Sequence, residues 1–139
     1  MHRRESEQQM NAERELASLL SRHASLRLAI LFGSAAAGRQ RPDSDVDVAV
    51  AGARGLSPQE RIELIGELAQ LTGRAVDLVD LTIASGTVLS RVLTTGRLLF
   101  CSDHTLYAEL IKKALYDDAD LERYRQRILG ARRDAWIGA

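Results

Sequence analysis

The apolar residues of this chain follow two different spacings, and each spacing predicts a different kind of element. Four short apolar runs, bounded by glycine, proline or charged residues, are typical of strands buried in a sheet. Apolar residues three or four positions apart instead predict amphipathic helices. The predicted strands are 27–32, 45–51, 75–81 and 97–100, and the predicted helices are 12–24, 57–73, 84–96 and 103–133.

The helix predicted from Ser57 to Gly73 carries its own start and stop signals. Ser57 is followed by Pro58 at the first helical position and by Glu60 three residues after the serine, which is the pattern of a capping box. Gly73 supplies the matching stop. The helix that follows has a weaker start, near Ala84. The buried stripe expected for the capped helix is Ile62, Ile65, Leu68, Ala69 and Leu71.

The order of these elements indicates a small α/β or α+β domain with one sheet and helices packed against it. The loop 33–44 is too short for a full crossover helix, so the first two strands are expected to be antiparallel or joined by a single helical turn. The sheet is therefore expected to be mixed. We expect one domain over 1–139, with a core over about 12–101 and a helical segment over about 103–133, in which Gly130 is a candidate break.

Charge is balanced over the whole chain, with 19 Lys and Arg against 19 Asp and Glu, and gives no sign of steering towards nucleic acid or a membrane. No apolar run approaches the ~20 residues of a membrane-spanning helix. The N-terminal stretch lacks the apolar region of a secretory signal. The single Cys101 excludes an internal disulfide and a multi-cysteine zinc site. We expect a cytoplasmic protein without membrane or direct nucleic-acid contact; the arginines within 123–133 fit either an anionic partner or a solvated helix face.

Two aspartates interrupt the second predicted strand, where a buried strand would normally carry apolar residues. Asp45 and Asp47 are two apart and therefore project to the same side, while Val46 and Val48 face the other side. Two neighbouring carboxylates repel each other and are costly to bury unless an opposite charge offsets them. Paired carboxylates are ligands for a hard divalent cation, so the sequence predicts a metal site here.

The third predicted strand offers two further carboxylates, Asp77 and Asp80. Because they are three apart, they are expected to face opposite sides of the sheet. Asp77 lies in the middle of the strand and is our candidate for a third metal-facing group. Asp80 lies near the strand end, where an aspartate more commonly forms a turn or a helix N-cap.

A phosphate-binding turn is expected where the first strand ends, at Gly33 and Ser34. Glycine lets a phosphate approach the backbone closely, and backbone N–H groups and a serine hydroxyl can bind its oxygens. In the loop that follows, Arg39 and Arg41 could contact a nucleotide or simply be solvated, and we take Arg39 as the candidate contact.

The stretch GSAAAGRQRPDSDVD, from Gly33 to Asp47, resembles the GS-x10-DxD signature of the polymerase-β-like nucleotidyltransferases. The short chain is similar to the minimal nucleotidyltransferase (MNT) subgroup, the antitoxin partners of HEPN-domain toxins. The similarity extends more loosely through VDLVDL, TTGRLLF and the C-terminal helix, so it covers nearly the whole chain. It implies the polymerase-β-like fold, a small mixed sheet flanked by helices.

The resemblance also implies a reaction and a role for each motif residue. Asp45 and Asp47 would bind Mg²⁺, expected as two ions, with Asp77 completing an acidic triad. Gly33 and Ser34 would bind the triphosphate of ATP. The family transfers AMP to an acceptor hydroxyl and releases pyrophosphate; in MNT–HEPN pairs the acceptor is a tyrosine of the toxin, whose RNase activity is silenced. The implied function is that of a protein adenylyltransferase, the antitoxin of a type VII toxin–antitoxin system.

Two other functions remain open at this point. Aminoglycoside nucleotidyltransferases share the signature and act on a small molecule, but they usually carry an additional substrate-binding domain, and only one helical segment follows the fourth predicted strand here. An antitoxin that acts by binding alone would need no catalysis. A pure binding module has no need of a clustered acidic face, so the intact motif favours the enzyme.

Overall fold

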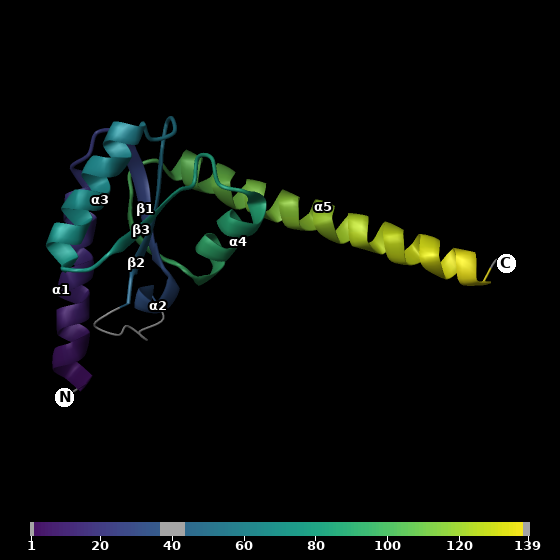
Figure 1. Cartoon of the computed structure of the whole chain (residues 1–139), viewed down its shortest axis with the longest axis horizontal. Coiled ribbons are helices and arrows are strands. Elements are labelled where there is room, and N and C mark those ends of the chain that lie inside the picture. The colour runs from purple at the N-terminus through teal and green to yellow at the C-terminus, as the bar shows by residue number, and fades with distance from the viewer. Residues whose placement is uncertain (1, 37–43, 138–139) are drawn as a thin grey trace.

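The computed structural model of the protein describes residues 2–36 and 44–137 (Figure 1). All four predicted strands are confirmed, and so are the four predicted helices, although some helix ends move. A short helix follows the first strand as well. The elements are α1 (His2–Ser21), β1 (Leu26–Phe32), α2 (Gly33–Ala36), β2 (Val46–Gly52), α3 (Pro58–Thr72), β3 (Val76–Asp80), α4 (Gly86–Thr95), β4 (Arg97–Cys101) and α5 (His104–Ile137).

The sheet is mixed, as predicted, with strand order β3-β2-β1-β4. β1 pairs antiparallel with both β2 and β4, while β2 and β3 are parallel. The single turn of α2 follows β1 directly, so the expected antiparallel pair with a helical turn in its connection is confirmed. This arrangement brings the end of β1 and the starts of β2 and β3 to one edge of the sheet, which we call the β2-start edge.

Helices cover both faces of the sheet, because successive strand residues point to opposite sides. On the face covered by α1 and α3, Val46 and Val48 pack with Leu16 of α1 and Leu68 of α3. On the other face, which is covered by α4 and α5, residues such as Ile30 and Ala49 pack with Leu89, Val92, Leu110 and Ala114. Figure 1 shows the two helix pairs on either side of the strands.

The first and last helices are longer than the sequence predicted. α1 begins at His2 and not at residue 12. Its first turns contain good helix formers, but they are polar and exposed and have no apolar stripe, so the spacing of apolar residues did not predict them. α5 runs through Gly130 without a break. A Cβ at Gly130 would meet open space, and a lone glycine in a helix costs only about 1 kcal/mol. α4 begins at Gly86 rather than Ala84.

The capping signals of α3 are confirmed, but its predicted stripe is partly wrong. The backbone N–H of Glu60 donates to the Ser57 hydroxyl at 3.1 Å, and the Ser57 N–H donates back to the Glu60 carboxylate at 3.1 Å. Gly73 ends the helix with φ of 67°. The helix packs through Leu64 and Leu68, which lie one turn apart, and this register leaves Ile62 71% exposed and Leu71 38% exposed.

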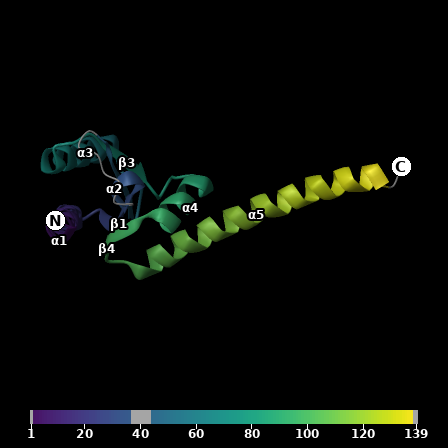
Figure 2. The ribbon, with the colours of Figure 1, turned by 90° about the horizontal axis from the view of Figure 1, so that it is seen from below.

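The distal part of α5 extends away from the sheet and the other helices, and both views show this (Figures 1 and 2). Among the α5 side chains that the structure describes, Leu110 and Ala114 are the last ones buried in this core. Among the residues that the structure describes, no helix has the length and apolar character needed to span a bilayer.

Candidate active site

The turn after β1 brings the backbone directly against a carboxylate. Gly33 has φ of 72°, a left-handed conformation that side-chain-bearing residues rarely adopt. A Cβ at Gly33 would overlap Oδ2 of Asp47, which lies opposite Phe32 in the β1–β2 ladder. Glycine is therefore required twice, by the backbone angle and by the close approach. The contact joins the two halves of the GS…DxD motif.

Asp47 and Asp77 occupy paired positions in the parallel ladder between β2 and β3. Asp47 precedes Ala49 by two residues and Asp77 precedes Val79 by two, so both carboxylates lie on the face of α4 and α5. Asp77 is exposed and Asp47 is half-buried. The backbone register therefore sets Asp77, the candidate third metal-facing group, beside Asp47 on the same face of the sheet. Asp45 precedes β2 and is exposed.

Burial and the neighbouring charges shift the pKa of Asp47. Burial raises the pKa of its carboxyl group above the ordinary value, and the negative charges of Asp77 and Asp45 raise it further. The positive charge of Arg91, on α4, acts in the opposite direction. Two neighbouring carboxylates thus act on Asp47 at the β2-start edge, with one arginine as a partial counter-charge.

These carboxylates are suitable ligands for a divalent cation, although their side chains do not form a complete coordination site. Among the described residues, no three His, Cys, Asp or Glu side chains are close enough to hold a metal ion as they stand. The donors are hard oxygens of the kind that Mg²⁺ prefers. A bound cation would also offset the burial of Asp47 and the repulsion by Asp77 and Asp45, which together raise the pKa of Asp47.

Asp80 has a structural role, as its position at the end of the strand predicted. Its carboxylate is buried and accepts hydrogen bonds from the backbone N–H groups of Leu56, at 2.7 Å, and Thr82, at 2.9 Å. It therefore fixes the turn after β3 and the approach to α3. The prediction that Asp77 and Asp80 face opposite sides of the sheet agrees with their neighbours, because Leu78 packs on the α1/α3 side and Val79 on the α4/α5 side.

The structure describes less of the remaining motif residues. Ser34 lies in α2, directly after Gly33. Arg39 and Arg41, the candidate nucleotide contacts, lie outside the described residues. Sequence reasoning missed Arg91, since a single arginine in an amphipathic helix carries no local sign that it faces a carboxylate from another element.

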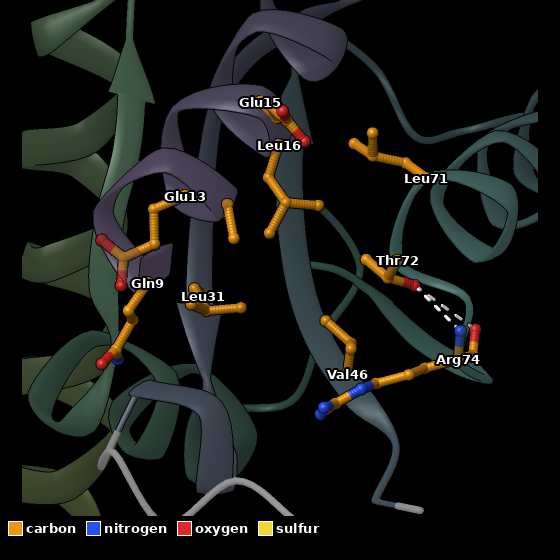
Figure 3. Close-up of a pocket in the computed structure, with 10 residues that line it drawn as sticks. Gln9, Glu13, Glu15, Leu16, Leu31, Val46, Leu71, Thr72 and Arg74 are labelled. Carbon is orange, nitrogen blue, oxygen red and sulfur yellow. Dashed lines mark hydrogen bonds between the residues drawn. The ribbon is translucent and has the colours of Figure 1, made fainter. Parts of the chain in front are cut away.

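A pocket of about 220 Å³ lies on the opposite face, between α1, α3 and the sheet (Figure 3). Leu16, Leu31 and Val46 line it, and Val46 points away from its neighbour Asp47. Arg74 also lines the pocket; its Nη1 atom is buried and has no hydrogen-bond partner among the described residues. The pocket is therefore separate from the carboxylates.

Residues 14–105 match the family model described as Polymerase beta, Nucleotidyltransferase. The chain belongs to this nucleotidyltransferase family. The resemblance inferred from the GS-x10-DxD motif is thereby confirmed, together with the fold that it implied.

Curated and solved relatives narrow the subgroup of this nucleotidyltransferase. It is 39% identical over 93 residues to the protein adenylyltransferase MntA of Shewanella oneidensis, covering 67% of each chain. It resembles a chain in the structure of a tri-AMPylated Shewanella oneidensis HEPN toxin in complex with MNT antitoxin (TM-score 0.69, 31% identity, 88% of this chain and 97% of that chain). It also resembles a chain in a toxin–antitoxin structure with AMP-PNP (TM-score 0.65, 30% identity, 91% of this chain and 98% of that chain).

Proposed function

We propose that this nucleotidyltransferase is a Mg²⁺-dependent protein adenylyltransferase and the antitoxin of a HEPN-domain toxin. It would transfer AMP from ATP to a tyrosine hydroxyl of the toxin and so silence it. The observation that carries the proposal is the juxtaposition of Gly33, Asp47 and Asp77 at one edge of the sheet, in a member of this family. The similarity to MntA and to an antitoxin in complex with an AMPylated toxin supports a protein acceptor.

Each part of the β2-start edge has a role in the proposed reaction. Asp45, Asp47 and Asp77 would hold the Mg²⁺ ions, and the Gly33–Ser34 turn would bind the triphosphate through its backbone N–H groups. Mg²⁺ bound there would supply positive charge that stabilises the phosphoryl group in transfer and the pyrophosphate that leaves. Arg91, whose charge already acts on Asp47, would bind phosphate oxygens beside the carboxylates.

Proton transfer is assigned to Asp77. Its carboxylate is exposed and therefore open to an acceptor that arrives from outside the chain. As the tyrosine oxygen bonds to the α-phosphorus, the bond to the pyrophosphate oxygen breaks and an Asp77 carboxylate oxygen takes the hydroxyl proton. In this role, Asp77 is a ligand and a base at the same position.

The two alternatives fit the observations less well. The similar antitoxin-complex chains are matched over 97% and 98% of their own length, so they carry no large additional substrate-binding domain. An antitoxin that acts by binding alone would not need clustered carboxylates, yet the pKa of Asp47 is raised by burial and, further, by the charges of Asp77 and Asp45.

Intact-mass spectrometry tests the proposal directly. A HEPN-domain protein, the proposed toxin, is incubated with the purified chain, ATP and Mg²⁺, and mass gains in whole AMP units are expected. The Asp45→Asn/Asp47→Asn variant should give no gain, whereas Glu63→Gln, which changes an exposed carboxylate on α3, should behave as wild type. A stable complex without any mass change would support the binding-only antitoxin instead.

A further inference from the structure

A second surface feature lies on the same face as the carboxylates, in the groove between α4 and α5. The groove encloses about 220 Å³. It is lined by Ser90, Leu93 and Thr94 from α4 and by Tyr107, Ile111, Ala114 and Leu115 from α5. Leu115 is 66% exposed and Ile111 is 37% exposed, so the groove presents apolar side chains to the outside. Such an apolar surface beside a reaction site is typical of a binding surface.

Helix α4 links the groove to the carboxylates through Arg91. Arg91 follows the groove residue Ser90 directly and lies one turn before Thr94, and the charge of Arg91 acts on Asp47. The core beneath α4 and α5 contains Ala49, two residues after Asp47 on the same face. A protein that brings a hydroxyl group to Asp47 and Asp77 would therefore pass close to this part of α4.

We propose that the α4/α5 groove is the docking site for the protein that supplies the acceptor hydroxyl. The occupant is an apolar anchor of that partner, one or two leucine-sized or aromatic side chains, set against Ile111 and Leu115. Such anchors commonly carry most of the affinity of an interface, while contacts around them mainly exclude water. The inference rests on the proposed function, because it takes the acceptor to be a protein.

The groove has a further use in the reaction. Transfer to a hydroxyl depends on holding that group in line with the α-phosphorus, and much of a barrier can be removed by such positioning. An anchor fixed beside Arg91 would limit which hydroxyl groups of the partner reach the carboxylates. The groove therefore contributes to acceptor specificity as well as affinity.

The test compares two equally exposed leucines of α5. Leu115→Asp places a charge in the groove, whereas Leu129→Asp, at a position that is 63% exposed, lies four turns further along the same helix. We expect Leu115→Asp to weaken binding to the HEPN protein by about tenfold or more in calorimetry. Its KM for that protein should rise, and kcat at saturation should fall as well, because the acceptor hydroxyl is held less well in line. Leu129→Asp should change neither quantity by more than about twofold.

Two further measurements separate the possible failures. AMP-PNP binding by Leu115→Asp should equal that of wild type, which shows that the fold and the nucleotide site are intact; Ile111→Ala serves as a milder second variant. Wild-type affinity of Leu115→Asp for the HEPN protein would overturn the proposal. The proposal would also be overturned if Leu115→Asp lost only self-association in sedimentation, because the groove would then be covered by a second copy of the chain. If wild type binds the HEPN protein without transferring AMP, the adenylyltransferase proposal fails, and an affinity loss in Leu115→Asp still supports docking here.

Discussion

At the scale of single residues, two glycines with positive φ allow the catalytic contact to be separated from backbone strain. Gly33 has φ of 72° and Gly73 has φ of 67°, but only Gly33 lies against a carboxylate. Alanine at either position should cost about 1–2 kcal/mol of folding free energy, from the left-handed conformation. Gly33→Ala should also displace Asp47 and lower the rate of AMP transfer by about 10²-fold or more. Gly73→Ala should keep its activity, and equal activities in the two variants would contradict the role given to the Gly33–Asp47 contact.

The raised pKa of Asp47 makes a prediction about stability and pH. A carboxyl group whose folded pKa exceeds its unfolded value of 3.8 binds protons more tightly in the folded state. Stability therefore falls as pH rises from 3.8 through the folded pKa, and the full penalty is present at neutral pH. We expect Asp47→Asn to melt higher than wild type at pH 7 without divalent cations, with the difference shrinking towards pH 3.8.

Two controls accompany that melting experiment. Millimolar Mg²⁺ should raise the melting temperature of wild type more than that of Asp47→Asn. Asp80→Asn should lose stability instead, because both oxygens of the Asp80 carboxylate accept backbone hydrogen bonds. A lower melting temperature for Asp47→Asn at pH 7 would mean that Asp47 is stabilised by its surroundings rather than strained by them.

At the scale of helices and strands, the two N-cap serines differ in what their side chains do. The Ser57 hydroxyl accepts a hydrogen bond from the Glu60 N–H, whereas Ser85, at the start of α4, makes no side-chain cap hydrogen bond. Ser57→Ala should therefore lower the free energy of unfolding by about 1 kcal/mol, as N-cap removal usually does. Ser85→Ala should change it by less than about 0.5 kcal/mol in the same urea titration. Similar losses in both variants would deny the capping box its contribution.

The elements also show what the sequence could and could not establish. Strands and the α3 caps followed from local chemistry, since apolar runs and Ser57, Glu60 and Gly73 act over a few residues. Asp77 was predicted as a third metal-facing group, but the register that sets it beside Asp47 is determined by the pairing of β2 with β3. Arg91 approaches Asp47 through tertiary packing, and no local pattern encodes that. The exposure of Ile62 was not predicted, because packing against the sheet determines which face of α3 is buried.

At the scale of the whole molecule, α5 divides into a packed part and a projecting part. Leu110 and Ala114 are its last residues in the described core, and the distal part of the helix runs away from the sheet in both views (Figures 1 and 2). A helix without tertiary support is only marginally stable in water. A chain that ends at Asp117 should therefore unfold in urea within about 0.5 kcal/mol of the full chain. Leu110→Ala, in the packed part, should lose about 2–5 kcal/mol.

The same shortened chain distinguishes the two parts of α5 as surfaces for a partner. It keeps Tyr107, Ile111 and Leu115 and hence the α4/α5 groove, but it lacks Leu129 and the arginines within 123–133. If the groove provides the main anchor, calorimetry with the HEPN protein should give an affinity within a few-fold of the full chain. A loss as large as that of Leu115→Asp would instead place the contact on the projecting helix, where the arginines would then bind an acidic surface. The outcome decides whether α5 serves the partner through its packed half or its projecting half.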